Sequence, residues 1–283
     1  MGRIAALLFG LSISAVGASP EYAAAQKLYQ KTDYRGAIQT LQPVSAKDGP
    51  AYLLLGQSHY MVGDYKKSSE ALEKAVAAEP RNSLYHLWLG RAFGRRAETS
   101  SPFTAPMYAS KTRQAFEKSV ELDGANKEAL NDLFEYYLEA PGFLGGGFDK
   151  ARDLSARIAK LDPVEGHYAQ FRLAEKRKDF AGAEQQLRRA AELAPRQVGR
   201  LVDLAKFLAR QGRIQESEQT FEQARKVAPG APRLLYDQAD AYVQAGRNLE
   251  KARALLEQYL STQLTPEDPP REEARKLLRK AGA

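Results

Sequence analysis

The chain has 283 residues, of which 43% are hydrophobic and 27% are charged, and its net charge is +7. This composition suits a soluble chain with a sizeable core, and it excludes a collagen-like or intrinsically disordered protein. There is no cysteine and there are only three histidines, His59, His86 and His167. We therefore predict no disulfide, no metal site and no cofactor.

Residues 1–18 have the layout of a secretory signal peptide. Arg3 precedes an apolar run from Ile4 to Val16, and the small residues Gly17 and Ala18 follow it. The run is shorter than the roughly 20 apolar residues that cross a bilayer, although an uncleaved anchor is the alternative. We predict cleavage after Ala18 and an exported protein, and we expect it in the periplasm.

A repeated pattern fills the chain from about residue 20 to 260. Its clearest copy runs from Ala51 to Pro80, with small residues at Gly56 and Ser68 and a turn at Gly63-Asp64-Tyr65. This spacing resembles the tetratricopeptide repeat, an antiparallel helix pair of about 34 residues. The resemblance implies an all-α fold, a right-handed superhelical solenoid whose helix pairs stack side by side.

We count seven such helix hairpins over residues 19–264. Small residues recur where the two helices of a pair must approach closely, as at Ala25, Gly56, Gly90, Ala205 and Ala239. A Pro-rich break follows from Thr265 to Pro270. The last segment, residues 265–283, ends in a helix over Arg271–Lys280 with Ala274, Leu277 and Leu278 on one face, which predicts a cap for the end of the solenoid.

Two insertions interrupt the repeat, near residues 98–110 and 141–147. The closing residues Pro80, Gly124 and Pro163 lie 44 and 39 residues apart, against a period of about 34. Because the first insertion carries Phe103, Met107 and Tyr108, we expect it to fold over the solenoid, either as a lid on a groove or as a plug between hairpins. The plug is the better interpretation, since apolar loop residues are usually buried.

The second insertion is rich in glycine, with Gly145, Gly146 and Gly147 in sequence. Their amides could cradle an anion at the start of the next helix, but the Lys-Ser/Thr of a P-loop is absent. The favoured alternative is that glycine only permits a turn with positive φ. Phe143 and Leu144 would then pack back onto the hairpin.

No arrangement of residues points to catalysis. The histidines are far apart in sequence and show no metal-ligand spacing, so we interpret His59 as a core residue. We predict that the protein is not an enzyme. The resemblance implies a protein-protein interaction scaffold that holds a partner segment in its concave face, and the alternative is a lipid or small-ligand carrier that uses the same groove.

The resemblance also implies that the concave face is lined by side chains from the first helix of each pair, here called the first helices. The predicted partner-binding residues are Tyr60, Leu87, Arg91, Arg95, Tyr168, Arg172, Lys176, Lys206, Arg210 and Tyr236. The aromatic and apolar members of this set suit an extended peptide or a helix, and the other six are basic.

Three of these first helices carry two cations one helical turn apart, at Arg91/Arg95, Arg172/Lys176 and Lys206/Arg210. Like charges at this spacing repel, so something must compensate them. An acidic protein or peptide is one candidate, and lateral pairing with Glu135, Glu139 and Asp240 is the other. We expect no nucleic acid as partner, because no recognition motif is present.

Overall fold

The computed structural model describes residues 19–282, so the predicted signal peptide lies outside the described part. Those residues form fifteen α-helices and one 3₁₀ turn. The helices are Pro20–Gln30 (α1), Tyr34–Leu41 (α2), Gly49–Met61 (α3), Tyr65–Ala78 (α4), Ser83–Thr99 (α5), Ala105–Leu122 (α6), Lys127–Glu139 (α7), Phe148–Leu161 (α8), Pro163–Lys176 (α9), Phe180–Leu193 (α10), Val198–Arg210 (α11), Ile214–Val227 (α12), Pro232–Ala245 (α13), Leu249–Ser261 (α14) and Arg271–Lys280 (α15), with the 3₁₀ turn at Gly142–Leu144 (η1).

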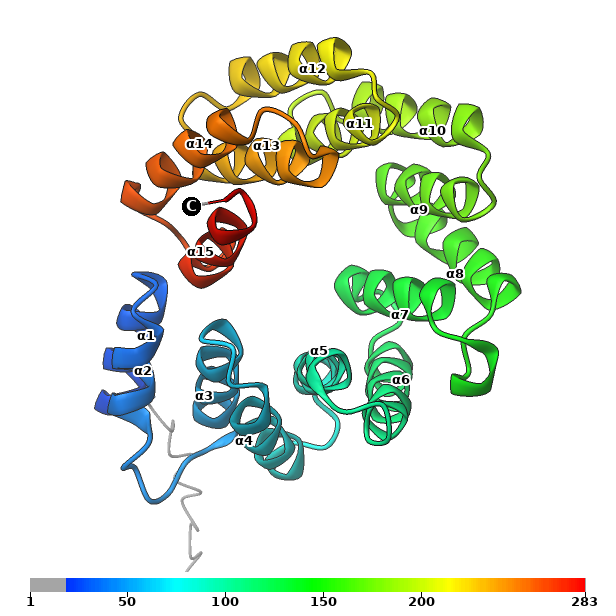
Figure 1. Ribbon diagram of the computed structural model, residues 1–283. Coiled ribbons are helices and arrows are strands. Elements are labelled where there is room, and N and C mark those ends of the chain that lie inside the picture. Colours follow the sequence, from blue (N-terminus) through cyan, green and yellow to red (C-terminus); the bar gives the residue numbers. More distant parts are fainter. Residues whose placement is uncertain (1–18, 283) are drawn as a thin grey trace, which may run out of the picture.

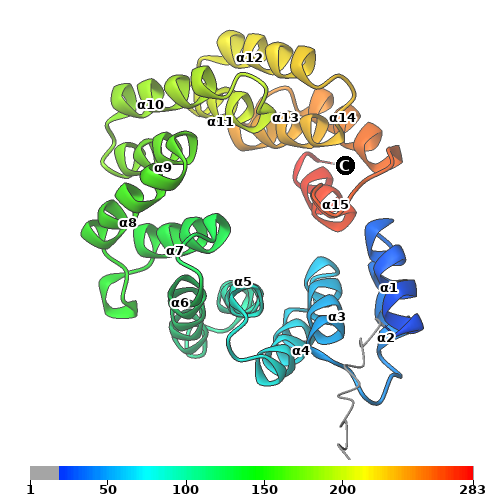
Figure 2. The same ribbon diagram turned by 180° about the vertical axis from the view of Figure 1, so that it is seen from behind.

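The helices follow one another as seven antiparallel pairs, from α1/α2 to α13/α14, which confirms the predicted count. The pairs stack into a curved solenoid (Figure 1). The first helices of the pairs, such as α5, α7, α9 and α11, lie on the inside of the curve, and the second helices lie outside, as the view from behind also shows (Figure 2). None of the helices over residues 19–282 is long and apolar enough to cross a membrane.

The turn inside a pair repeats one geometry in several hairpins. An aspartate caps the second helix, as where Asp33 Oδ1 accepts a hydrogen bond from the Gly36 amide over 2.9 Å, since carboxylates satisfy the free amides of a first turn. The residue before this cap position has left-handed backbone geometry, with φ from 59° to 81° at Thr32, Gly63, Lys178 and Gly212. This conformation favours glycine.

Small residues bring the helices of a pair into close contact, as predicted. A Cβ atom added to Gly56 would lie 2.5 Å from Leu72 Cγ, and one added to Gly90 would lie 2.5 Å from the Phe116 ring. Leu72 and Phe116 are both buried. These glycines therefore set the distance between α3 and α4 and between α5 and α6.

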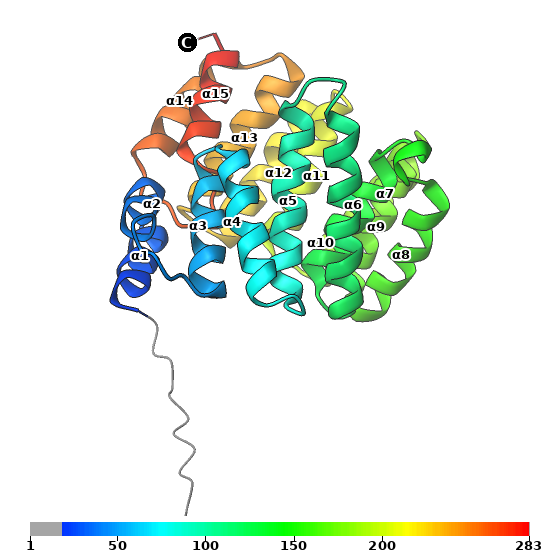
Figure 3. The same ribbon diagram turned by 90° about the horizontal axis from the view of Figure 1, so that it is seen from below.

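The insertion near residues 98–110 is neither a lid nor a plug. It lengthens α5 at its end and α6 at its start, so that only residues 100–104 connect them. Tyr108 stacks on Phe93 with ring centroids 6.2 Å apart, but Phe103 is 94% exposed and Met107 is also exposed. The expectation that Phe103 packs on the solenoid is wrong, because the longer helices carry the connection beyond the neighbouring hairpins (Figure 3).

The glycine-rich insertion is a turn and not an anion cradle. The amides of Leu144, Gly145, Gly146 and Gly147 donate to backbone carbonyls of the same hairpin, which leaves them no free hydrogen for a ligand. Gly145 has φ +88°, and a Cβ on Gly146 would lie 1.8 Å from the Ala140 carbonyl oxygen. Leu144 is half-buried, whereas Phe143 is 82% exposed, so the expectation that Phe143 packs back is wrong because η1 turns it outward.

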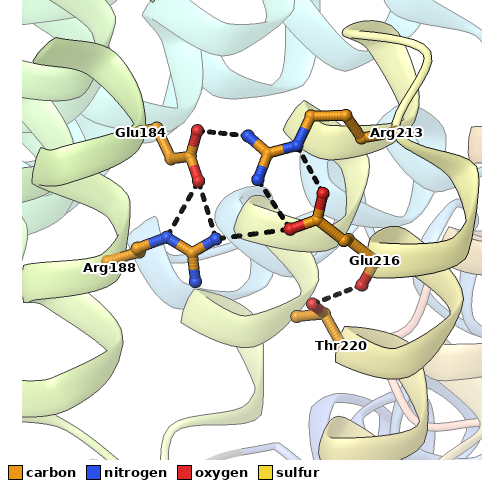
Figure 4. Close-up of polar contacts among 5 residues, drawn as sticks. All are labelled: Glu184, Arg188, Arg213, Glu216 and Thr220. Carbon is orange, nitrogen blue, oxygen red and sulfur yellow. Dashed lines mark hydrogen bonds and ion pairs between the residues drawn. The ribbon is translucent and has the colours of Figure 1, made fainter. Parts of the chain in front are cut away.

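Ion pairs link the outer helices. Glu184 and Arg188 of α10 meet Arg213 and Glu216 at the start of α12 (Figure 4). Arg188 Nη2 lies 2.6 Å from Glu184 Oε1, and Arg213 Nη2 lies 2.6 Å from Glu216 Oε2. Exposed pairs of this kind add little stability, and this network joins the second helices of the fifth and sixth pairs.

The last helix covers the end of the solenoid. Ala274 and Leu277 of α15 are buried against the seventh pair, in a cluster with Tyr259 and Leu264. The Tyr259 hydroxyl donates to the Pro269 carbonyl, which anchors the Pro-rich break. The predicted terminal cap is thus present, and it continues the apolar core of α13 and α14.

Candidate functional site

A groove with a volume of about 1000 Å³ runs along the inner face across α7, α9, α11 and α13. Four consecutive first helices therefore contribute to one surface. Most of its polar lining is charged, with six carboxylates and five cations: Asp132, Glu135, Glu165, Glu175, Asp203 and Asp237, and Arg172, Arg200, Lys206, Arg210 and Arg233.

The structure brings four of the predicted residues together in this groove, namely Tyr168, Arg172, Lys206 and Arg210. Tyr60, Arg91 and Arg95 line a separate hollow of about 340 Å³ beside it. Lys176 lies at the end of α9, where it pairs with Glu139. Tyr236 is half-buried, and its ring packs against Tyr259 with centroids 5.5 Å apart.

Leu87 lines neither the groove nor the hollow beside it. Its exposed fraction is 0%, and it lies in a core cluster with Phe116 of α6 and with Leu130 and Leu133 of α7. Because α5 and α7 pack side by side, this position faces the neighbouring helix and not the groove. The prediction for Leu87 is therefore wrong.

Carboxylates of α7 hold the first cation of the first pair, Arg91, whereas Arg95 has partners on α4 and on its own helix. Arg91 Nε donates to Asp132 Oδ2 over 2.6 Å and Nη2 to Glu128 Oε2 over 2.9 Å. Arg95 donates to the Tyr65 hydroxyl over 3.0 Å and also pairs with Glu98. Sequence analysis missed Glu128 and Asp132 as partners.

The second cation pair is neutralised as the lateral alternative predicts. Arg172 Nη1 lies 2.8 Å from Glu135 Oε2, and its Nη2 lies 3.0 Å from Glu139 Oε1. Lys176 Nζ lies 2.7 Å from Glu139 Oε2. The carboxylates of α7 thus hold Arg91 of α5 and both cations of α9.

The third pair, on α11, is held from both sides. Lys206 Nζ lies 2.6 Å from Asp240 Oδ2 of α13, as predicted, and Arg210 Nη2 lies 2.7 Å from Glu175 Oε1 of α9. Arg200, which sequence analysis missed, pairs with Glu165 of α9 at 2.8 Å and with Asp203 at 2.9 Å.

A sequence signal for these missed partners exists. Arg200 and Glu165 are 35 residues apart, and so are Arg210 and Glu175, which is close to one repeat of about 34 residues. A cation and a carboxylate at equivalent positions of neighbouring repeats lie side by side on stacked first helices. The inner face is consequently a ladder of opposite charges.

Aromatic rings support the guanidinium groups of this ladder. The Arg200 guanidinium lies 4.5 Å from the Tyr168 ring centroid, and that of Arg91 lies 5.0 Å from the Trp88 ring. Such stacking restricts the side chains. One such guanidinium, Arg200, lies in the groove, and the other, Arg91, lies in the hollow beside it.

Burial disfavours the charged form of several groove carboxylates. It raises the pKa of Asp203 to about 6, although the nearby Arg200 lowers it, and it also raises the pKa of Asp132 and of Glu135 above their ordinary values. Burial likewise lowers the pKa of His59, whose side chain lies in the core as predicted. In residues 19–282, no group of three or more side chains has the arrangement of a metal site.

The family profile described as "Tetratricopeptide repeat" matches residues 53–96 and 202–269. A tetratricopeptide repeat protein from Parabacteroides merdae is similar in structure with a TM-score of 0.59 and 13% identity, and the match covers 94% of this chain and 100% of that one. A thermophilic TPR protein from Thermus thermophilus gives a TM-score of 0.54 and 18% identity, with 66% of this chain and 97% of that one covered. These similarities show the fold alone.

No curated protein sequence matches the chain significantly. Three observations indicate the same repeat fold: the seven stacked helix pairs, the small residues at the contacts within pairs, and the matching repeat profile. The chain therefore carries tetratricopeptide repeats over residues 53–96 and 202–269, and its described residues have the fold of a tetratricopeptide-repeat solenoid.

Proposed function

We propose that the protein is a non-catalytic scaffold that binds an extended segment of another protein in the groove across α7, α9, α11 and α13. One observation carries this proposal. Four consecutive first helices line a single groove of about 1000 Å³ with ordered polar and aromatic side chains. A surface of this kind suits a peptide backbone and its polar side chains, because both can exchange hydrogen bonds with it.

The ion pairs bear on the chemistry of the partner. Arg172, Lys206 and Arg210 all have carboxylate partners within 3.3 Å, so the chain's own carboxylates largely neutralise these cations. An acidic segment would have to replace those pairs, which reduces its advantage. We therefore favour a segment of mixed charge that contacts the two most exposed cations, Arg210 and Arg233.

The lipid carrier is not favoured by the groove. Charged side chains extend along its whole length, and no residue of 98–110 lines it. A lipid chain would leave the buried carboxylates and guanidinium groups without water, which is costly. The scaffold is the function that agrees with both observations.

We also propose that the chain is exported, on the evidence of the apolar run in residues 4–16 and the small residues after it. Expression in a bacterial host with an intact secretion pathway should yield a protein that begins at Ser19. N-terminal sequencing of the periplasmic fraction measures this. Recovery of Met1 on membrane-bound material would contradict cleavage after Ala18.

The groove is tested by a pair of matched variants. Arg210 and Arg233 lie in the groove with side chains 44% and 63% exposed, and Arg188 and Arg189 lie on α10 with 47% and 54%. Changing either pair to alanine removes two positive charges from an exposed surface. Partners are first captured on the wild-type protein from an extract and identified, and their affinity for all three proteins is then measured.

The proposal expects weaker binding of the groove variant Arg210→Ala/Arg233→Ala and unchanged binding of the control Arg188→Ala/Arg189→Ala. Melting curves check that both variants fold. Equal affinity of both variants and the wild type for the captured partner would exclude the groove cations from recognition. A loss confined to the α10 variant would place the binding surface on the outer face.

A further inference from the structure

The C-terminal segment reaches back to the first hairpins of the chain. Arg271 Nη1 donates to Thr32 Oγ1 over 3.1 Å, across 239 residues of sequence. The same guanidinium donates from Nη2 to the Thr262 carbonyl over 2.7 Å. One side chain thus ties the turn of the first pair to the end of the seventh, and α15 lies between α14 and α1 (Figure 1).

A second polar contact lies beside the first. Arg95 Nη2 of α5 is 3.8 Å from Glu273 Oε1 of α15. Two hollows flank these contacts, one of about 230 Å³ next to Tyr34 and Arg271 and one of about 280 Å³ next to Tyr60 and Glu273. The interface between the two ends is therefore incompletely filled, and its hollows are lined by Met61, Val62 and Pro270 as well as by charged side chains.

The two sides of the C-terminal segment differ in the strength of their attachment. Toward the seventh pair, Ala274 and Leu277 are buried in an apolar core. Toward the first three pairs, one hydrogen bond and one partly exposed ion pair make the polar contact. Exposed ion pairs contribute little, so the segment can separate from the first hairpins and stay attached to the last.

Thr32 supplies an independent observation. It has φ +59°, in the left-handed region, whereas the equivalent turns of the second and sixth pairs place glycine there, at Gly63 and Gly212. A β-branched residue in this region is strained. Strain of this kind marks positions where a side chain has a task, and the Thr32 hydroxyl accepts the bond from Arg271.

We propose that the polar edge of the first three helix pairs is a docking surface for the chain's own segment 265–280, which acts as a reversible latch between the two ends of the solenoid. When the latch is closed, the inner face can be entered only along the axis of the curve. When it opens, the ends move apart and the groove becomes accessible from the side. The purpose of the latch rests on the proposed groove function, but its existence does not.

The latch is tested by the distance between the two ends. The chain contains no cysteine, so cysteines introduced at the exposed positions Lys27 and Lys280 would alone carry spin labels. Double electron–electron resonance then gives the distance distribution in the otherwise wild-type chain, in Thr32→Gly, in Arg271→Ala and in the control Lys178→Gly. Lys178 has the same left-handed turn, with φ +61°, but it lies between α9 and α10, on the other side of the curve from α15 (Figure 1).

The proposal expects one narrow, short distance in the wild type and in Lys178→Gly. Thr32→Gly should give a broader and longer distribution, although it relieves backbone strain. In about 1 M salt, charges are screened beyond roughly 3 Å, which weakens the pair between Arg95 and Glu273. The distance distributions of a Glu273→Gln variant and of the wild type should therefore become alike. A melting curve for each variant confirms that the helices remain folded.

Identical distributions for Thr32→Gly, Arg271→Ala and the wild type would overturn the latch. A broad distribution already present in the wild type would overturn it equally, because the ends would then not be held. Neither result depends on a binding partner. Failure of the latch therefore leaves the groove proposal standing, and failure of the groove variants leaves the distance measurement unaffected.

Discussion

At the scale of single residues, the inner face is organised by pairs of opposite charge on neighbouring first helices. Glu135 and Glu139 of α7 hold Arg172 of α9, and Glu175 of α9 holds Arg210 of α11. The sequence predicts part of this, because the cations stand one helical turn apart and require compensation. The sequence alone does not show whether carboxylates of a partner or of the chain itself compensate these cations, because this depends on how the helices stack.

Changing Glu135 and Glu139 to glutamine tests the lateral pairs. We expect a loss of about 1 kcal/mol in the free energy of unfolding, because these side chains are partly exposed and such pairs are weak. Urea unfolding measures the loss. The control Glu121→Gln removes an exposed pair within α6, with Lys118, and should cost less; an equal cost would mean that pairing between helices adds nothing.

Asp203 predicts a defined pH dependence. Burial raises its pKa from the ordinary 3.8 to about 6, so its contribution to stability is complete below about pH 4 and is lost as the pH rises toward about 6. The variant Asp203→Asn lacks this titration. Relative to Asp203→Asn, the wild type should therefore lose stability between about pH 4 and about pH 6 in melts at fixed ionic strength, whereas parallel curves would show that Asp203 titrates normally.

At the scale of helices, the register of the repeats and the positions of the insertions could be predicted, but the structure of the insertions could not. Gly56 and Gly90 mark contacts within a pair because no larger residue fits, and this information is local to each repeat. Leu87 was placed wrongly because its burial depends on how α7 packs on α5. Phe103 was placed wrongly because the inserted residues form additional helical turns, and apolar composition alone does not decide which loop residues are covered.

Two glycines of α5 give a sharp test of helix packing. Gly90→Ala should destabilise by about 1 to 3 kcal/mol, because the new methyl group would overlap the stiff Phe116 ring. Gly94→Ala should instead be neutral or stabilise by up to about 1 kcal/mol, since its Cβ would lie 3.7 Å from Thr112 and alanine favours a helix. Thermal melts compare them; equal effects would refute the assigned contact.

Removal of residues 271–283 tests the cap. The deletion uncovers Tyr259 and Leu264, which are almost completely buried in the full chain. We expect a lower melting temperature and association through the exposed face of α13 and α14. Light scattering after size exclusion detects the association; a truncated protein as stable and as monomeric as the full chain would show that α15 is not a cap.

At the scale of the whole molecule, the seven pairs curve until the C-terminal segment meets the first hairpins. The repeat pattern predicts the solenoid because each pair contacts mainly its neighbours. It does not predict the contact between Thr32 and Arg271, which depends on curvature accumulated over all the pairs. The groove and the routes into it are consequences of that curvature.

The central claim is that partners bind the inner face, and site-specific photo-crosslinking tests it most directly. Benzoylphenylalanine is placed either at Tyr168, which lines the groove, or at Leu193, which is exposed at the end of α10, and cross-links to the captured partner are mapped by mass spectrometry. The account predicts adducts from position 168, confined to one short segment of the partner, and none from position 193. Adducts from position 193 with none from position 168 would contradict it.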